Sequence, residues 1–259
     1  MPELDRADRE QSAGLPDMQG AAAAASTEPL LAVNGLQAWY GESHILHGVD
    51  FQIRSGELVT ILGRNGAGKT TTLKSIMGII RKRKGSIRFQ GQELIQLSSH
   101  QIARKGIAFC PEERGIFASL NVDENLLLPP RVQDGGMSRE AVLELFPNLK
   151  ERLNSQGTKL SGGEQQMLAI GRILRTGARL LLLDEPTEGI APVIVQQIGG
   201  TIRRLKQEGF TIVLVEQNFR FAQRIADRHY VMERGKMIDM ILNSELEANM
   251  SKLRSYLGV

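Results

Sequence analysis

The sequence predicts an α/β protein with a mostly parallel sheet, and three observations support this fold class. Continuous apolar runs have the composition of strands that are covered on both faces. They are 58–62, 180–183 and 211–215. Helical spacing of apolar residues follows the first two runs, over 73–80 and 194–205. Period-two alternation at 48–53 and 86–89 predicts antiparallel strands on both sides of the first run.

Composition limits the classes of protein that the chain can represent. Its 259 residues suffice for one large α/β domain with an appendage. A net charge of +3 is compatible with nucleic acid or an anionic membrane but requires neither. The single cysteine, Cys110, cannot form an intrachain disulfide, which fits a reducing compartment. No apolar run approaches the ~20 residues of a membrane span, and the start lacks the pattern of a secretory signal. We therefore expect a cytoplasmic protein that reaches a membrane only through a partner.

The beginning of the chain differs from the remainder. Residues 1–28 combine scattered charges, prolines and a run of alanines, and we expect them to form a disordered extension. The folded domain is expected over 29–259. Its first strands are predicted at 31–33 and 48–53, with Trp39-Tyr40-Gly41 between them.

The segment after the first helix begins with the basic run 81–84, which breaks the pattern. A solvated turn is the favoured interpretation of this run, and a nucleic-acid contact is the alternative. A helix capped by Ser98 or Ser99 is predicted over 98–106. A buried strand over 107–110 follows, and Pro111 stops it.

No strand is predicted between 113 and 158, where helices and loops alternate and Pro147 ends a helix. We therefore expect a helical subdomain, about 113–165, inserted in the α/β core. Three elements are predicted near the end of the chain. They are a helix over 220–226, a hairpin of 230–232 and 236–238 around Arg234-Gly235, and an amphipathic helix over 244–257.

A glycine-rich loop joins the first apolar run to the first helix. Strand, loop and helix in this order are the context of a phosphate-binding loop, because glycines let backbone N–H groups approach phosphate oxygens and the helix start adds a positive dipole end. Lys69 would reach the β- and γ-phosphates, and the Thr70 hydroxyl would ligate Mg²⁺. The alternative is a turn that only resembles this motif. The loop residues are Gly63, Arg64, Asn65, Gly66, Ala67, Gly68, Lys69 and Thr70.

Two carboxylates, Asp184 and Glu185, end the apolar run 180–183. Ligands of α/β sheets bind outside the carboxyl ends of strands. Asp184 is therefore placed to hold Mg²⁺ directly or through water, and Glu185 is suited to polarise a water for attack on the γ-phosphate. The alternative is an acidic pair that caps a turn.

The stretch 160–166 predicts a second anion-binding helix N-terminus, because a serine and two glycines precede a helix with Glu164 in its first turn. One chain then has two phosphate-type sites but one carboxylate pair. We infer a head-to-tail dimer in which Ser161 and Gly163 of one copy close over the nucleotide of the other. A generic capped helix is the alternative.

These motifs together resemble those of ABC transporter ATP-binding proteins. The loop 63–70 is similar to the Walker A motif, 180–185 to Walker B and 160–166 to the ABC signature. The resemblance covers about residues 30–259. It implies a P-loop NTPase core with a RecA-like sheet, an antiparallel β subdomain and a helical subdomain, with ATP and Mg²⁺ bound.

The resemblance also implies roles for further residues. Tyr40 would stack on adenine, although it could instead be an ordinary aromatic at a strand end. Thr71 would contact the α-phosphate, and Gly162 would bind nucleotide beside Ser161 and Gly163. Residues 188–191 would form the D-loop at the dimer seam.

Two positions depart from the general pattern of the family. Glu112 stands where the family has glutamine, and its carboxylate can ligate Mg²⁺ or hold the attacking water. Gln217 stands at the switch-histidine position, where it can hydrogen-bond a phosphate oxygen but cannot become cationic. With the strings 188–192, 215–218 and 256–258, these residues are similar to the LivF-type ATPases of branched-chain amino-acid importers. The related urea and short-chain amide importers share much of this pattern.

The resemblance implies several partners. Two ATPase subunits, identical or paralogous, would lie under two membrane permeases at the cytoplasmic face of the inner membrane, with an extracytoplasmic solute-binding protein and no nucleic acid. Ile116, Phe117 and Leu120 offer an apolar surface for a permease helix, or they pack the helical subdomain.

Three alternatives remain at this point. The first is the ATPase of another ABC transporter. The second is an ABC ATPase of repair or translation, which usually has a coiled-coil insertion or a duplicated domain. The third is a P-loop kinase or GTPase, which leaves 160–166 unexplained.

Overall fold

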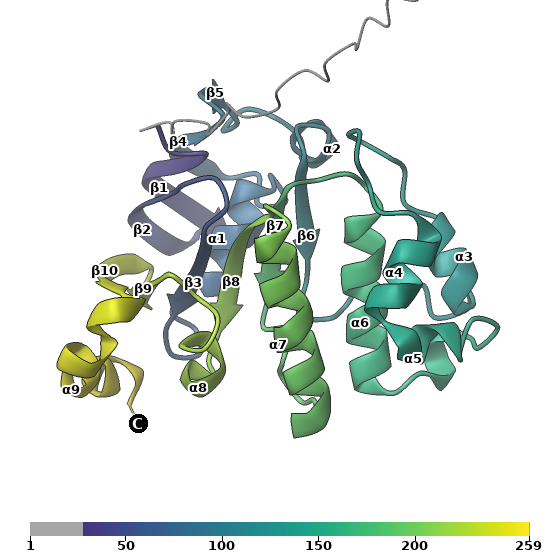
Figure 1. Ribbon diagram of the computed structural model, residues 1–259. Coiled ribbons are helices and arrows are strands. Elements are labelled where there is room, and N and C mark those ends of the chain that lie inside the picture. The colour runs from purple at the N-terminus through teal and green to yellow at the C-terminus, as the bar shows by residue number, and fades with distance from the viewer. Residues whose placement is uncertain (1–27, 259) are drawn as a thin grey trace, which may run out of the picture.

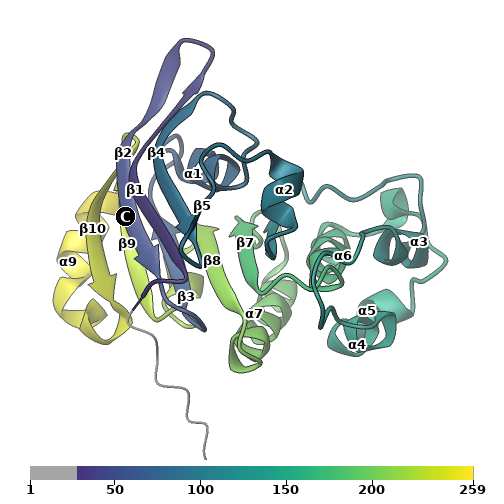
Figure 2. The ribbon, with the colours of Figure 1, turned by 90° about the horizontal axis from the view of Figure 1, so that it is seen from above.

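The fold combines two sheets with helices packed around them. The computed structural model describes residues 28–258, so the expected extension lies outside the described residues except for its last residue. One sheet has the strand order β2-β1-β4-β5 and the other β10-β9-β3-β8-β7-β6. Figure 1 and Figure 2 show the smaller sheet beside the larger one, with α1 next to both.

The strands have the following bounds: β1 Leu31–Tyr40, β2 Ser43–Ile53, β3 Leu58–Leu62, β4 Arg83–Phe89, β5 Gln92–Glu93, β6 Ile107–Cys110, β7 Leu180–Asp184, β8 Thr211–Glu216, β9 Arg228–Glu233 and β10 Lys236–Leu242. The helices are α1 Lys69–Ile76, α2 Ser99–Ala103, α3 Val122–Leu127, α4 Arg139–Leu145, α5 Pro147–Lys150, α6 Gly162–Leu174, α7 Pro192–Gln207, α8 Phe219–Ala222 and α9 Leu246–Leu257. Two 3-10 turns, η1 Gly157–Lys159 and η2 Asn243–Glu245, complete the chain.

The centre of the larger sheet confirms the predicted α/β class. The three apolar runs form β3, β7 and β8, and every residue of these strands is buried. Strands β6, β7, β8, β3 and β9 pair in parallel. Parallel strands that are buried on both faces read as continuous apolar runs, which explains why the sequence identified them. Their carboxyl ends meet at one edge of the sheet, where the phosphate loop follows β3.

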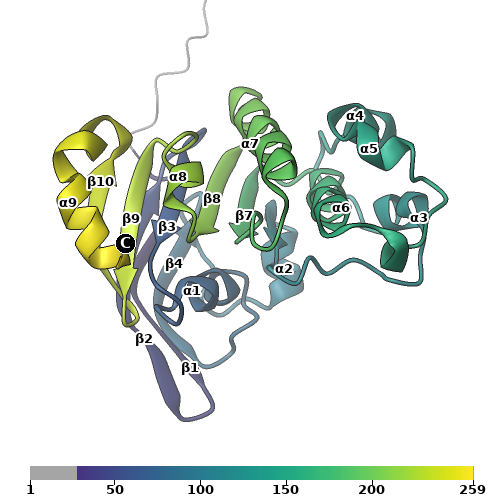
Figure 3. The same ribbon diagram turned by 90° about the horizontal axis from the view of Figure 1, so that it is seen from below.

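Two apolar cores lie on either side of the larger sheet. One core joins α1 to the inner faces of both sheets through side chains such as Leu73, Ile61 and Leu36. The other joins the sheet to α6 and α7 and to the helices α3–α5, through side chains such as Leu168 and Ile202. Figure 3 shows α3–α6 gathered at the end of the molecule opposite α9. No helix within residues 28–258 is both long and apolar enough to cross a membrane.

Several predicted boundaries were wrong, each for a local reason. Trp39 and Tyr40 complete β1 rather than lying between strands, because their backbone pairs with β2 across the Gly41-Glu42 turn. The first helix ends at Ile76 because Gly78 adopts a φ of 71°, although Met77 and Ile80 remain buried as predicted. The helices predicted over 98–106 and 220–226 shrink to the single-turn α2 and α8.

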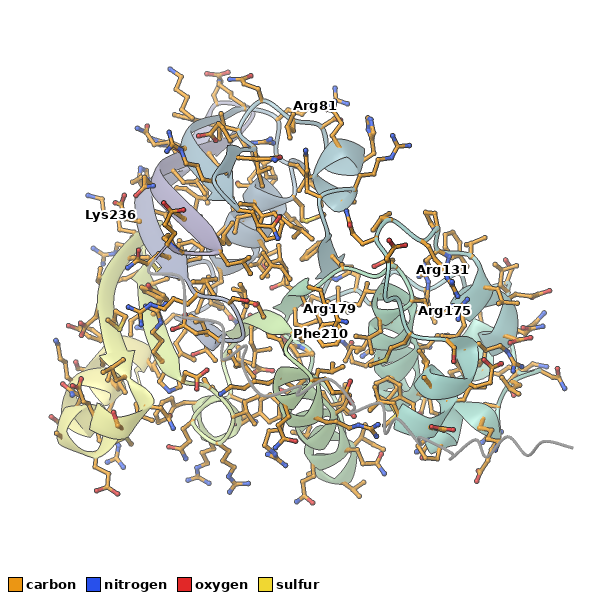
Figure 4. All side chains as sticks on the ribbon, turned by 45° about the horizontal axis from the view of Figure 1, so that its top comes forward. Arg81, Arg131, Arg175, Arg179, Phe210 and Lys236 are labelled. Atoms are coloured by element: carbon orange, nitrogen blue, oxygen red, sulfur yellow. The ribbon has the colours of Figure 1, made fainter. Side chains whose placement is uncertain are left out.

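The basic run 81–84 is not one solvated turn. Arg83 begins β4, and its guanidinium donates hydrogen bonds to the carbonyls of Ile80 at 2.8 Å and Leu97 at 2.9 Å. Arg81 is exposed at the outer edge of the molecule in Figure 4. The same view shows Arg179 beside Phe210, whose ring centroid lies 4.7 Å from the guanidinium. Pro147 both ends α4 and starts α5, since proline suits the first position of a helix.

The hairpin predicted at 230–238 is confirmed as β9 and β10, and its turn residue Gly235 supports the phosphate loop. Its N–H donates to the Ala67 carbonyl and its carbonyl accepts from His47 N, both at 2.8 Å. Gly235 has a φ of 75°, and a side-chain carbon there would lie 1.9 Å from the Ile45 oxygen.

We expect Gly235→Ala to lower the free energy of unfolding by roughly 2–4 kcal/mol, because the alanine would be strained and would collide with backbone. The control is Gly200→Ala in α7, where a side-chain carbon would meet nothing within 4 Å. This control should raise stability by roughly 0.5–1 kcal/mol, as alanine favours helix. Urea unfolding of both variants measures the difference. Equal stabilities would contradict the claim that Gly235 has no room for a side-chain carbon.

Candidate functional site

A cavity of about 430 Å³ opens at the carboxyl edge of the larger sheet. It brings together residues that the sequence analysis named separately. They are Tyr40, Asn65, Gly66, Ala67, Gly68, Lys69, Thr70, Thr71, Glu112, Glu185, Glu188 and Gln217. These side chains come from β1, the phosphate loop and three different strand ends, so the fold alone assembles them.

The phosphate loop has the backbone that its glycines predict. Gly66 and Gly68 adopt φ of 77° and 109°, which residues with side chains rarely reach. A side-chain carbon on Gly63 would lie 2.4 Å from the Met232 oxygen, so this position has no room for one. Gly68 precedes α1 without a side-chain cap. The first N–H groups of α1 therefore face the cavity as donors for an anion.

Lys69 is buried at the floor of this loop, with 4% of its side chain exposed. Its ammonium donates to the Gly63 carbonyl at 3.0 Å and the Arg64 carbonyl at 3.3 Å, and it lies 3.2 Å from Glu185 Oε1. The lysine is thus the cation that partners the carboxylate at the end of β7.

Asp184 and Thr70 form a pair that fits Mg²⁺. The Thr70 hydroxyl donates to Asp184 Oδ1 at 3.0 Å, whereas the buried Oδ2 has no hydrogen-bond partner among the described residues. Burial raises the pKa of Asp184 to about 6, and the nearby carboxylates of Glu185 and Glu112 act in the same direction. A hard divalent cation prefers such oxygen donors and would satisfy the orphaned oxygen. Glu112 is exposed on the cavity wall, and its negative charge helps to raise the pKa of Asp184.

Glu185 lies directly after β7 and adopts a φ of 44°, so the chain turns its carboxylate into the cavity. Gln217 Nε2 donates to its Oε2 at 2.6 Å. Burial raises the pKa of Glu185, but hydrogen bonding with Glu188, the charge of Lys69 and the Gln217 donor outweigh burial and lower it. Glu185 is therefore ionised and oriented, which are the properties a group needs to polarise water.

Two further carboxylates beside the site received no role of their own in the sequence analysis, although residues 188–191 were assigned to the D-loop. The pKa of Glu188 is raised to about 7 by hydrogen bonding with Glu185, by burial and by the charge of Glu185. Glu216, buried at the end of β8, accepts from the Thr187 hydroxyl at 2.7 Å and from Asn218 N at 3.2 Å. It ties the segment after Glu185 to the segment that holds Gln217. The sequence did contain a signal for Glu216, because an acidic residue directly after the apolar run 211–215 is expected at the carboxyl edge of the sheet.

The stretch 161–163 lies outside this cavity. Ser161 caps α6, and Glu164 Oε2 accepts from Ser161 N at 2.7 Å in return. A side-chain carbon on Gly163 would lie 2.6 Å from Ile194 of α7, which explains the need for glycine there. Within one chain, the structure therefore does not bring Ser161, Gly162 and Gly163 to the phosphate loop.

The segment 116–120 was predicted either to offer an apolar surface to a permease helix or to pack the helical subdomain. The structure shows one residue of each kind. Ile116 packs on the core shared by α3–α7, whereas the Phe117 side chain is 46% exposed. Leu127 and Leu128, at the end of α3, are also exposed. Apolar side chains on the surface of these helices are available for a partner.

Comparison with known proteins agrees with this geometry. The family model described as ABC transporter matches residues 46–188. The chain is 44% identical to the high-affinity branched-chain amino acid transport ATP-binding protein BraG of Pseudomonas aeruginosa, over 88% of this chain and all of BraG. It is 32% identical to the lipopolysaccharide export system ATP-binding protein LptB of Escherichia coli, over 88% of this chain and 97% of LptB.

Solved structures also match the fold. An ATP-binding subunit of an ABC transporter aligns with a TM-score of 0.75 at 26% identity, over 89% of this chain and all of that chain. A nucleotide-free ATP-binding cassette aligns with a TM-score of 0.78 at 23% identity, over 90% of this chain and 99% of that chain.

The raised pKa of Asp184 gives a pH dependence for the metal-free protein. The folded state binds this proton more tightly than the unfolded chain, whose aspartate has a pKa of 3.8. Ionised Asp184 therefore destabilises the fold above its folded pKa of about 6, and this penalty disappears as the pH falls towards 4.

We expect Asp184→Asn to raise the free energy of unfolding at pH 8 by up to roughly 3 kcal/mol, with a smaller gain at pH 5. Urea unfolding at both pH values in chelator measures this difference. Asp134→Asn, at an exposed loop position, is the control and should change little at either pH. A gain for Asp184→Asn that is the same at both pH values would contradict the assignment.

Proposed function

The chain belongs to the ABC transporter family and is an ATPase, and we propose that it is the ATP-hydrolysing subunit of an importer for branched-chain amino acids. The observation that carries the proposal is a cavity lined by the phosphate loop, Glu185 and Gln217, with Asp184 hydrogen-bonded to Thr70 of that loop. The similarity to BraG, at 44% identity over its whole length, supports the solute class.

ATP is the substrate that this cavity fits. Backbone N–H groups of the loop and the start of α1 bind the phosphates, and Lys69 exchanges its carbonyl partners for β- and γ-oxygens. Tyr40, at the end of β1 and 47% exposed, stacks on the adenine. Thr71 contacts the α-phosphate.

The hydrolytic chemistry rests on three residues of this chain, Glu185, Gln217 and Lys69. Glu185 holds the attacking water and accepts its proton, while Gln217 orients that carboxylate. Thr70 and Asp184 would hold Mg²⁺, and Glu112, which lines the cavity, would be a third oxygen donor. When bound, Mg²⁺ neutralises charge on the transferred phosphoryl group.

A second ATPase subunit completes the site. Because Ser161–Gly163 lie outside the cavity of their own chain, we infer that they close over the nucleotide of another copy or of a paralogue. The segment of about 113–165 is then a helical subdomain of the domain 29–259, which moves relative to the core as the dimer closes.

The transport partners follow from the family. Permease subunits dock at the exposed Phe117 and the end of α3. The chain then lies at the cytoplasmic face of the inner membrane, held there by these partners. An extracytoplasmic receptor supplies the solute. Another ABC transport role is the second candidate, because LptB also matches at 32% identity. Uptake of labelled leucine by cells with the matching receptor and permeases separates the two.

Glu185→Gln tests the catalytic assignment. We expect hydrolysis to fall by at least about 100-fold, because the amide cannot accept the proton of the attacking water. ATP binding should persist, and the ATP-bound dimer should last longer. Phosphate release and size-exclusion chromatography with ATP measure these effects, and turnover at the parent rate would remove Glu185 from the reaction.

Gln217 requires a different pair of variants. Gln217→Ala removes the donor that orients Glu185, and we expect kcat to fall by roughly 10-fold with little change in KM. Gln217→His can still donate to the carboxylate, so hydrolysis should persist. Equal loss in both variants would indicate that the glutamine has another role.

A further inference from the structure

The turn that follows β6 has an unusual backbone. Arg114 adopts a φ of 66°, and Gly115 follows with a φ of 61°. Residues with side chains rarely occupy this left-handed region and stay there only when surrounding contacts hold them. The Pro111 carbonyl accepts from Arg114 N at 2.9 Å, which closes the turn. The conformation directs the arginine away from Glu112, which lines the nucleotide cavity, and towards α6.

The guanidinium of Arg114 contacts the first turn of α6. Its Nη1 donates to Gln165 Oε1 at 3.0 Å. A side-chain carbon on Gly162 would lie 3.2 Å from Nη2 and 3.5 Å from Cζ, so the planar group lies against the glycine backbone. Any larger residue at Gly162 would push the arginine away.

Gln165 extends this contact to the residues before the helix. Its Nε2 donates to the carbonyls of Leu160 at 3.1 Å and Gly157 at 3.2 Å. Arg114 and Gln165 therefore hold both sides of the turn that presents Ser161. A turn with two adjacent glycines has many accessible conformations, and ordering it in advance reduces the entropy lost on binding.

Further contacts attach the same turn to the helices. Arg172, which lies further along α6 than Gln165, donates to the Gly115 carbonyl, and its guanidinium lies 4.8 Å from the ring centroid of Phe117. The buried Asn125 of α3 accepts from Phe117 N and donates to its carbonyl, both at 2.9 Å. Residues 114–117 are thus hydrogen-bonded to α3 and α6, whereas Glu112 and Glu113 are exposed.

We propose that Arg114 is a positioning residue of the ATPase reaction, which locks the turn 160–163 in the shape that closes on the nucleotide of a second subunit. The inference rests on the dimer in the proposed function. Arg114 does not line the cavity of its own chain. Its loss should therefore weaken closure between subunits and leave nucleotide binding by a single chain unchanged.

The test uses the full chain in the Glu185→Gln background, in which ATP is not consumed. Arg114→Gly removes the guanidinium and suits the backbone conformation, so the fold should be retained. We expect ATP-dependent dimerisation, followed by analytical ultracentrifugation, to weaken by about tenfold or more. Affinity for a fluorescent ATP analogue at low protein concentration should stay within about twofold of the parent. Amide hydrogen exchange of residues 160–165 in the single chain should accelerate.

Three variants serve as controls. Gln165→Ala should reproduce the loss, and the double variant should be no worse than either single one. Arg114→Lys keeps the charge but lacks the planar fork, and it should not restore dimerisation. Arg175→Ala, at the far end of α6, should behave like the parent.

Each outcome decides a separate point. A Glu185→Gln parent that stays monomeric with ATP counts against self-association in the proposed function, and hydrogen exchange then decides the role of Arg114. Unchanged exchange at 160–165 overturns the role of Arg114. Weaker nucleotide binding by the single chain also overturns it, because the arginine would then act in its own cavity.

Discussion

The buried ion pair between Lys69 and Glu185 is the interaction on which the remainder of the site depends. Five carboxylates, those of Glu112, Asp184, Glu185, Glu188 and Glu216, lie at the carboxyl edge of the sheet, and the Lys69 ammonium lies 3.2 Å from Glu185 Oε1. Burying like charges together is unfavourable unless cations or protons balance them. In this site the Lys69 ammonium balances Glu185, and the pKa values of Asp184 and Glu188 are raised to about 6 and about 7, which favours their protonated forms.

This charge balance links stability to ligand binding. Each carboxylate that a divalent cation or a donor satisfies no longer opposes folding, so binding free energy appears as stability. Within residues 28–258, Asp184 has one oxygen with a hydrogen-bond partner and one without, so its stability depends most directly on a bound cation. Glu216 is balanced differently, because the Thr187 hydroxyl and Asn218 N–H compensate part of its burial. Glu216 therefore connects the segment after β7 to the segment after β8 through hydrogen bonds.

The contacts around the phosphate loop show how small residues permit this arrangement. Gly63, Gly163 and Gly235 each face a backbone or side chain at a distance that excludes a side-chain carbon. The neighbouring elements are β9 at Gly63, α7 at Gly163 and β2 at Gly235. Gly63 and Gly235 are thus packed directly against backbone oxygens rather than against long side chains. The Arg114 turn instead uses a long side chain to hold the start of α6, with one residue in the left-handed region.

The sequence by itself determined the α/β class, the central strands and the phosphate loop, because these depend on local periodicity and on glycine at set positions. It also identified Asp184 and Glu185, since a polar residue directly after a buried strand is a local signal. Tertiary structure decided which strand ends meet, and hence that Gln217 donates to Glu185 and that Glu216 binds Thr187. It also decided the lengths of α2 and α8, where packing overrides weak helical preference. Residues far apart in the chain carry no mark of their contact, so the hydrogen bond from Arg114 to Gln165 of α6 became visible only in the folded molecule.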